Sequence, residues 1–210
     1  MTRDIGISER LDLLAAQAAQ TTEGNGDRED GSVTLAWILE QLNERAFGLF
    51  LVILALPCCI PFLYGVPQVV SVPLMFVSLQ LLVGRSTPWL PARFAARTIS
   101  VQTLRSLSDR AGPWLRKLEL FSRPRMTALT RPPAERIVGG ALVLFSASIL
   151  VPLPLTNSVP AVAVAIIAGA LLQRDGLFVL LGMLLGTAWI ASLIFAGASL
   201  ISLIRTWLGM

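Results

Sequence analysis

The chain's first long uncharged run is broken at its centre by the stretch Ala55-Leu56-Pro57-Cys58-Cys59-Ile60-Pro61-Phe62-Leu63-Tyr64-Gly65-Val66-Pro67. This run covers residues 47–84, and a second proline-broken run covers residues 137–173. One crossing of the hydrocarbon layer, about 30 Å thick, needs about 20 apolar residues. Each run is therefore long enough to cross twice, or to enter, turn and leave. The sequence predicts an all-α, polytopic membrane helix bundle.

The second run resembles the first. Its centre reads Leu150-Val151-Pro152-Leu153-Pro154-Leu155-Thr156-Asn157. Ser158-Val159-Pro160 follows this centre, as Ser71-Val72-Pro73 follows the centre of the first run. An apolar stretch then leads to Arg85 in the first run and to Arg174 in the second, and a gap of two residues is needed to align the two arginines. We interpret the runs as two duplicated Pro-broken helical hairpins, residues 45–85 and 137–175.

Composition agrees with a membrane protein. Hydrophobic residues make up 54% of the chain, and the charged fraction of 14% is well below the roughly 25% of soluble domains. The mean hydropathy is +0.70. A soluble fold is therefore disfavoured. The net charge of +4 is explained by positive loops that orient the protein in the membrane. No nucleic-acid partner is therefore expected.

Few residues could support metal or acid–base chemistry. The chain has no histidine, the commonest general base and metal ligand. Its two cysteines, Cys58 and Cys59, are neighbours that could form only a strained bridge. We interpret them as small apolar fillers and expect no metal, no cofactor and no catalytic residue.

The N-terminal part is more polar. Residues 1–31 form an acidic, partly disordered segment, and no positive region precedes an apolar one as in a secretory signal peptide. In residues 32–46 apolar side chains recur at near-helical spacing. This pattern predicts an amphipathic helix at the membrane surface, at the start of a membrane domain that covers residues 32–204.

The positive charge is densest between the hairpins. Residues 85–136 hold eleven Arg or Lys against three carboxylates, with amphipathic helical spacing in residues 86–136. Positive loops remain in the cytoplasm, which predicts a cytoplasmic location for this segment and a multi-pass protein of the bacterial inner membrane. The segment either recognises a phosphorylated lipid or acidic polymer, or acts only as an anchor on the anionic leaflet.

The last uncharged run is residues 176–204, before a short tail at 205–210. Its 29 residues would span about 43 Å as one helix, which fits one tilted crossing or two short segments. Trp189 near its middle favours two segments, because tryptophan prefers the membrane interface. The expected total is five or six segments. Gly182 and Gly186 permit close helix approach, either inside the bundle or in a homo-oligomer.

Several motifs resemble the ExoD family of bacterial exopolysaccharide synthesis proteins. They are Arg45-Ala46-Phe47-Gly48, the proline-rich turn, Leu79-Gln80-Leu81-Leu82-Val83-Gly84-Arg85 with Pro88-Trp89-Leu90-Pro91, and Gln173-Arg174-Asp175-Gly176-Leu177. The resemblance covers residues 32–204. It implies an inner-membrane protein linked to exopolysaccharide production, with the polysaccharide machinery as partner. The Cys-Cys pair departs from the plainer Pro-Gly-rich turn expected of the family.

The paired helix breaks are the candidate site. Interrupted hydrophobic segments at corresponding positions point to a binding site, because broken helices expose backbone groups inside the membrane. The candidate substrate-binding residues are Pro61, Tyr64, Gly65, Pro67, Gln68, Pro152, Pro154, Thr156, Asn157 and Pro160. The alternative is that the prolines only join two antiparallel helices. The charged pair Arg174 and Asp175 is either functional or a tight cytoplasmic loop.

Three functions are compatible with these features. The first is a non-catalytic membrane protein that assists exopolysaccharide synthesis or export and handles a lipid-linked or anionic substrate at the paired turns. The second is a small secondary transporter, indicated by the duplication and the broken helices. The third is a membrane glycosyl or phosphoglycosyl transferase. It ranks lowest because such chemistry uses carboxylates, and the hydrophobic runs contain none.

Overall fold

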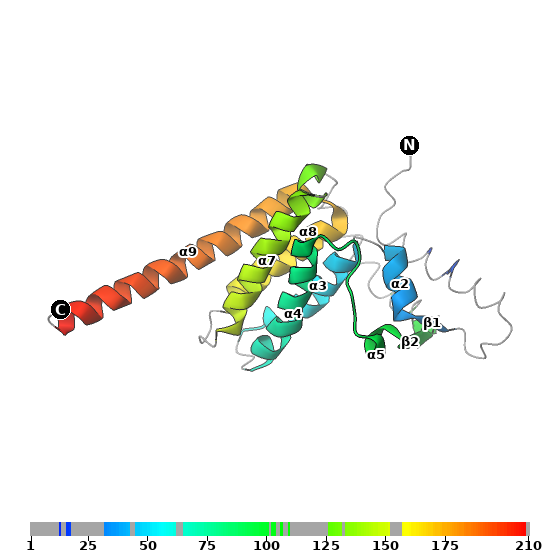
Figure 1. Ribbon diagram of the computed structural model, residues 1–210, viewed down its shortest axis with the longest axis horizontal. Helices are drawn as coiled ribbons and strands as arrows, with labels where there is room; N and C mark the ends of the chain where they lie inside the picture. Colours follow the sequence, from blue (N-terminus) through cyan, green and yellow to red (C-terminus); the bar gives the residue numbers. More distant parts are fainter. Residues whose placement is uncertain are drawn as a thin grey trace.

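Helices dominate the computed structural model (Figure 1). It describes residues 13, 16–17, 32–42, 45–61, 65–100, 102–103, 106, 109, 126–131, 133–151 and 157–208. The elements in chain order are β1 (Ser32–Thr34), α2 (Leu35–Leu42), α3 (Arg45–Cys58), α4 (Val66–Val83), α5 (Ala92–Ala95), β2 (Thr98–Ser100), η1 (Thr127–Thr130), α7 (Ala134–Leu150), α8 (Ser158–Gln173) and α9 (Gly176–Trp207). The predicted helical class is confirmed, apart from two very short strands.

Helices α3, α4, α7 and α8 form a four-helix bundle. Helix α4 packs mainly on α7 and α3 mainly on α8, with further contacts within the pairs α3–α4 and α7–α8. Each helix thus lies between two others, and α4 and α8 occupy diagonal corners. The core consists of fully buried apolar side chains from all four helices, the largest being Phe47 and Phe145. These are the two runs that the sequence marks as apolar.

The first hairpin is shaped by proline and glycine. Pro57 lies in the last turn of α3, and Pro67 lies in the first turn of α4, where a missing N–H costs little. Helix α4 ends at Gly84, whose φ of 85° is the left-handed conformation that glycine adopts without strain. The backbone N–H of Arg85 closes this end by donating to the Gln80 carbonyl over 3.1 Å.

The second hairpin ends in the same way. Helix α8 stops at Arg174, which is left-handed with a φ of 55°. The Asp175 N–H then donates to the Ala170 carbonyl over 2.9 Å. This bond matches the Arg85–Gln80 bond of the first hairpin at the same offset from the helix end.

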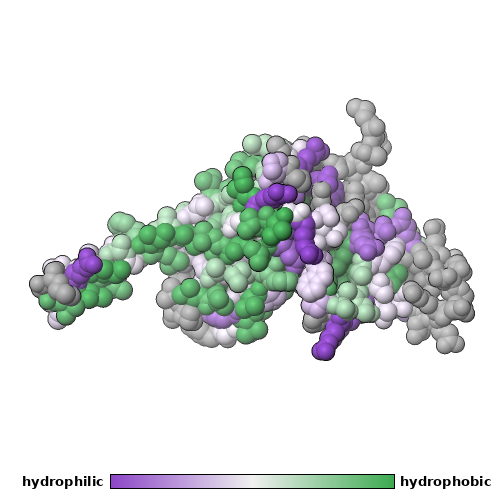
Figure 2. All heavy atoms as spheres, viewed as in Figure 1, coloured by the Kyte–Doolittle hydropathy of each residue, from purple (hydrophilic) through white to green (hydrophobic). Residues whose placement is uncertain are grey.

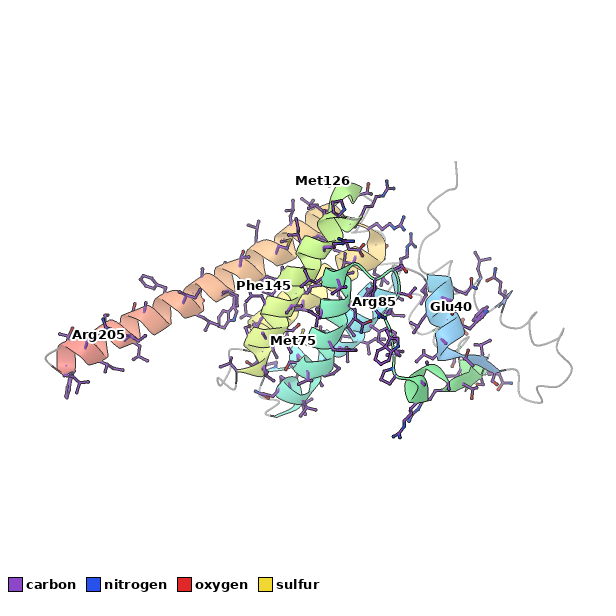
Figure 3. All side chains as sticks on the ribbon, in the orientation of Figure 1. Glu40, Met75, Arg85, Met126, Phe145 and Arg205 are labelled. Atoms are coloured by element: carbon purple, nitrogen blue, oxygen red, sulfur yellow. The ribbon has the colours of Figure 1, made fainter. Side chains whose placement is uncertain are left out.

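Helix α9 is one continuous helix of 32 residues. The last apolar run is therefore a single helix, and the interpretation as two segments that Trp189 favoured is wrong. Its first half packs on α8 and more lightly on α7. Its second half extends away from the bundle (Figure 1). Figure 3 shows Arg205 near its far end.

Strands β1 and β2 and helix α2 form a small layer beside the bundle. Strands β1 and β2 pair antiparallel, with Val33 opposite Ile99. Helix α2 buries Ile38, Leu39 and Leu42 in an apolar cluster with Val33 and Ala46. The helix predicted for residues 32–46 is confirmed only over Leu35–Leu42, because β-branched Val33 and Thr34 pair with a strand far away in the sequence.

The predictions for residues 1–31 and for the amphipathic helices of residues 86–136 fall mostly outside the described residues. Within the described residues, α4 and α9 are long and apolar enough to cross a membrane, and α3 and α8 are shorter apolar helices. Their length and composition agree with the predicted membrane character.

Candidate functional site

Both proline turns lie at one end of the bundle. Near the start of α3, a Cβ on Gly48 would lie 2.7 Å from the backbone nitrogen of Leu172, near the end of α8. Near the start of α7, a Cβ on Gly139 would lie 2.5 Å from the backbone nitrogen of Leu82, near the end of α4. The partners are therefore antiparallel. The last residues of α3 and α7 and the first residues of α4 and α8 lie at one end of the bundle, which we call the turn end.

The opposite end is the arginine end. It carries Arg45 and Arg136 at the starts of α3 and α7, and Arg85 and Arg174 just beyond the ends of α4 and α8. In Figure 2 hydrophilic residues gather over this end and the small layer, whereas hydrophobic residues cover α9 and the rest of the bundle. The two ends thus differ in charge as well as in connectivity.

Two candidate amides lie at the turn end. Gln68 is in the first turn of α4, and Asn157 immediately precedes α8. Their side-chain oxygens are buried, and within the part of the chain that the structure describes neither accepts a hydrogen bond. Buried polar atoms are nearly always satisfied, so each unsatisfied one needs an explanation. Because α4 and α8 are diagonal, the amides approach the bundle from opposite corners.

The other candidate residues have varied positions. Pro61 and Gly65 lie between α3 and α4 and are exposed. Pro67 and Pro160 are buried in the first helical turns of α4 and α8. The remaining candidates lie outside the described residues: Tyr64, Pro152, Pro154 and Thr156. Of the ten candidates, Gln68 and Asn157 are thus the described residues with polar side chains.

The vicinal cysteines are free thiols. The Cys58 thiol is buried and lies 3.5 Å from the Leu54 carbonyl and 3.9 Å from the Pro67 carbonyl. These weak contacts join the end of α3 to the start of α4, as expected for a small apolar filler. Among the described residues no three His, Cys, Asp or Glu side chains cluster to hold a metal ion.

The charged pair lies at the arginine end and shapes a helix start. The Asp175 carboxylate accepts hydrogen bonds from the N–H groups of Leu177 (3.0 Å) and Phe178 (3.4 Å), which caps α9. Arg174 supplies the left-handed residue between α8 and α9. This geometry favours the tight-loop interpretation of the pair.

Two further polar contacts at the arginine end are also structural. The Gln80 amide donates to the Trp89 carbonyl (3.2 Å) and accepts from the Trp89 N–H (2.5 Å), while Phe76 and Trp89 make an edge-to-face contact at 6.1 Å. The guanidinium of Arg136 lies over Gly84, where an added Cβ would be 2.5 Å from its Nε. Sequence reasoning noticed Gln80 but could not find its partner, because no local pattern encodes a contact across a chain reversal.

These features define an all-helical protein with two hairpins whose turns share one end of a bundle. The chain belongs to the ExoD family: the family described as "Exopolysaccharide synthesis, ExoD" matches residues 13–195. An uncharacterised protein of Synechocystis sp., slr1875, is 30% identical over 186 residues, covering 84% of this chain and 88% of that protein. Protein ExoD of Rhizobium meliloti is 29% identical over 189 residues, covering 85% of this chain and 74% of that protein. No solved structure gives a significant match.

Proposed function

We propose that this chain is a multi-pass inner-membrane protein that handles a lipid-linked glycosyl substrate at the turn end of its bundle, without catalysing a reaction on it. Membership of the ExoD family supports involvement in exopolysaccharide synthesis. The observation that carries the proposal is the pair of buried, unsatisfied amide oxygens of Gln68 and Asn157 at the turn end.

The exposed surface supports the membrane assignment. Large apolar side chains on α9 are widely exposed, among them Phe195 at 76% and Trp207 at 88%. Within a membrane, lipid or a second copy of the chain would cover such a surface, whereas soluble monomers rarely expose large contiguous apolar patches. The arginine end would face the cytoplasm, since positive residues are retained on that side. The C-terminus of α9 would then reach the opposite side.

The packing supports a duplicated hairpin. In a duplicated bundle α3 would correspond to α7, and α4 would correspond to α8. The α4–α7 interface would then correspond to the α8–α3 interface, and these two are the largest interfaces of the bundle. The Gly139–Leu82 approach would likewise correspond to the Gly48–Leu172 approach. A pseudo-two-fold axis through the bundle centre accounts for both correspondences.

Burial follows the same correspondence. When α3 is aligned with α7 so that Gly48 corresponds to Gly139, five buried residues of α3 fall opposite buried residues of α7. The pairs, in order, are Phe47, Gly48, Leu51, Ala55 and Cys58 with Val138, Gly139, Leu142, Ser146 and Ile149. When α4 is aligned with α8 so that Gly84 corresponds to Arg174, six buried residues of α4 fall opposite buried residues of α8. The pairs, in order, are Ser71, Leu74, Val77, Ser78, Gln80 and Leu81 with Ala161, Val164, Ile167, Ala168, Ala170 and Leu171.

Helix length supports shallow insertion of both hairpins. The four bundle helices have 14 to 18 residues, or about 21 to 27 Å at 1.5 Å per residue. The hydrocarbon layer is about 30 Å thick. With the arginine end at the cytoplasmic surface, the proline turns would lie within the layer or at its far boundary. This gives five membrane segments, four of them re-entrant or short.

The site chemistry fits a glycosyl group. Amide side chains both donate and accept, and an unsatisfied amide oxygen needs a donor such as a sugar hydroxyl. The start of an α-helix also leaves some backbone N–H groups without an intrahelical acceptor, which suits the phosphate that joins a sugar to its lipid, although Pro67 and Pro160 contribute none. A lipid tail would remain in the surrounding membrane. Substrate handling at this end thus needs no catalytic carboxylate.

A secondary transporter is the second candidate. The duplicated pairing favours it, because transporter folds often consist of two repeats with the substrate site between their broken helices. Purified protein in proteoliposomes would distinguish the two functions. Flux that depends on an ion or solute gradient supports transport, whereas binding without flux supports substrate handling.

The function is tested by removing each amide while keeping its volume. Asn157→Leu and Gln68→Leu should lower exopolysaccharide yield about tenfold per membrane-inserted protein, because a lost site hydrogen bond is worth about 1–2 kcal/mol. The matched control is Thr187→Val on the exposed face of α9, where the hydroxyl bonds only its own helix. Unchanged normalised yield in both amide variants would remove the proposed site.

A further inference from the structure

The first half of α9 is seated on the second hairpin by two glycines. A Cβ on Gly182 would lie 2.5 Å from an Ile167 side-chain carbon of α8, and a Cβ on Gly186 would collide with the Phe145 ring of α7. Figure 3 shows Phe145 where α7 faces α9. The Gly182–Gly186 pair therefore serves packing inside the chain, which was one of its two predicted roles.

The second half of α9 is exposed along its length. From Ile194 onward every residue to Leu208 is exposed, with Ile194 at 68% and Phe195 at 76%. Gly197 lies in this half, and a Cβ there would meet no atom within 4 Å. A glycine inside a helix is destabilising relative to alanine. Within the chain, this glycine lacks the close approach that Gly182 and Gly186 have.

The two hairpins differ where α9 is seated. Phe145 is fully buried beneath α9, whereas its counterpart Leu54 on α3 is only partly buried. Ala163 on α8 is fully buried, whereas its counterpart Pro73 on α4 is exposed. The first hairpin thus has the equivalent of the α9-binding face, and none of the helices that the structure describes lies on it. We call this face the repeat-one seat: Leu54, Val69 and Pro73.

We propose that copies of this chain assemble head to tail, with the distal half of α9 of one copy lying on the repeat-one seat of the next. The proposal rests on the duplication proposed above. Each copy has one empty seat and one unseated half-helix.

Helix length also fixes where the contact lies. Helix α9 is about 48 Å long, more than the roughly 30 Å layer, so it must cross obliquely. Its distal half therefore leaves its own bundle at the depth of the turn end. Val69, which is 73% exposed near the start of α4, is at that depth, whereas Val83, which is 68% exposed, is at the arginine end.

The symmetry of the bundle sets the kind of assembly. A pseudo-two-fold axis places the occupied seat on the second hairpin and the empty seat on the first hairpin on opposite sides. The contact between copies is then heterologous, since different faces meet. Heterologous contacts produce rings or open arrays rather than closed two-fold dimers.

Cysteine cross-linking in membranes tests the contact. Two differently tagged copies are co-expressed in a Cys58→Ala, Cys59→Ala background, one carrying Phe195→Cys and the other Val69→Cys. Cross-linking between tags should exceed that of the Phe195→Cys and Val83→Cys pair about tenfold, because the contact raises effective concentration only at the turn end. Equal cross-linking with Val69→Cys and Val83→Cys overturns the proposal.

A second measurement tests the head-to-tail geometry. A single chain carrying both Phe195→Cys and Val69→Cys should cross-link into a ladder beyond the dimer, and a dimer band alone overturns the heterologous contact. Gly197→Leu should weaken the ladder severalfold, whereas Gly169→Ala, at another glycine with no neighbour within 4 Å, should leave it unchanged. Yield defects at Asn157 and Gln68 do not depend on the ladder, so the two proposals can fail separately.

Discussion

The two ends of the bundle use their polar side chains differently. At the arginine end, Asp175 caps α9, Gln80 holds the Trp89 backbone and Arg136 covers the end of α4. At the turn end, the amide oxygens of Gln68 and Asn157 are buried and accept no hydrogen bond from the described residues. The Gln173 amide nitrogen at the arginine end is likewise buried without a hydrogen-bond partner among the described residues, so the two ends differ in their caps and backbone-binding side chains rather than in every polar group.

The largest expected effect is at a close backbone contact near the arginine end. Gly48→Val should cost about 3 kcal/mol or more, because its Cβ would lie 2.7 Å from a backbone atom that cannot move away. The measurement is the amount of folded protein in membranes and its unfolding temperature in detergent. Gly169→Ala is the control, since a Cβ there meets nothing within 4 Å. A stable Gly48→Val variant would contradict the close α3–α8 packing.

The next effect concerns the cap of α9. Asp175→Ala should lower the free energy of unfolding by about 1–2 kcal/mol, because two N–H groups of α9 lose their acceptor. Asp175→Asn retains an acceptor oxygen and should lose less. Thermal unfolding in detergent compares the three proteins. Equal loss in both variants would mean that the charge, and not the cap, carries the contribution.

An effect of similar size is expected at Gln80. Gln80→Leu should cost about 1–2 kcal/mol by removing both hydrogen bonds to the Trp89 backbone. Polysaccharide yield should fall only in proportion to protein abundance. Trp89→Ala removes the ring contact with Phe76 and keeps the backbone groups that Gln80 binds, which separates the two contacts. A yield defect beyond the loss of protein would make the arginine end functional as well.

The smallest effect on stability is expected at the turn end. Gln68→Leu and Asn157→Leu should change the free energy of unfolding by about 0 kcal/mol or raise it slightly, because an unsatisfied buried oxygen is replaced by an apolar group. The same variants should lose yield, as proposed above. Destabilisation by about 1 kcal/mol or more would show that these amides have structural partners, and the contrast between the two ends would disappear.

Sequence reasoning came closest where the signal was local. Proline and glycine placed both hairpins, since Pro67 and Pro160 lie in first helical turns and Gly84 ends α4. Gln68 and Asn157 are two of the ten residues that the sequence marked as candidates, and they are the described amides at the turn end. The Asp175 cap was not predicted, although an Asp immediately before an apolar helix is a usual capping signal.

The duplication proposed above would align the two hairpins differently from their letters. The letters pair Ser71-Val72-Pro73 with Ser158-Val159-Pro160 and then need a gap, whereas buried positions and helix ends would pair Ser71 with Ala161 and Gly84 with Arg174 without one. Helix register follows which residues face a neighbouring helix and where the helix ends. A three-letter match contains neither kind of information.

The sequence by itself determined that the chain is helical and apolar, where its hairpins break and which family it belongs to, because these depend on composition, proline and glycine. Only the tertiary structure decided that α3 and α7 end where α4 and α8 begin, that β1 pairs with β2, and that α9 packs on the second hairpin. The physical reason is that these features arise from close contacts between segments far apart in the chain. Such contacts depend on the shapes of both partners, which no local pattern records.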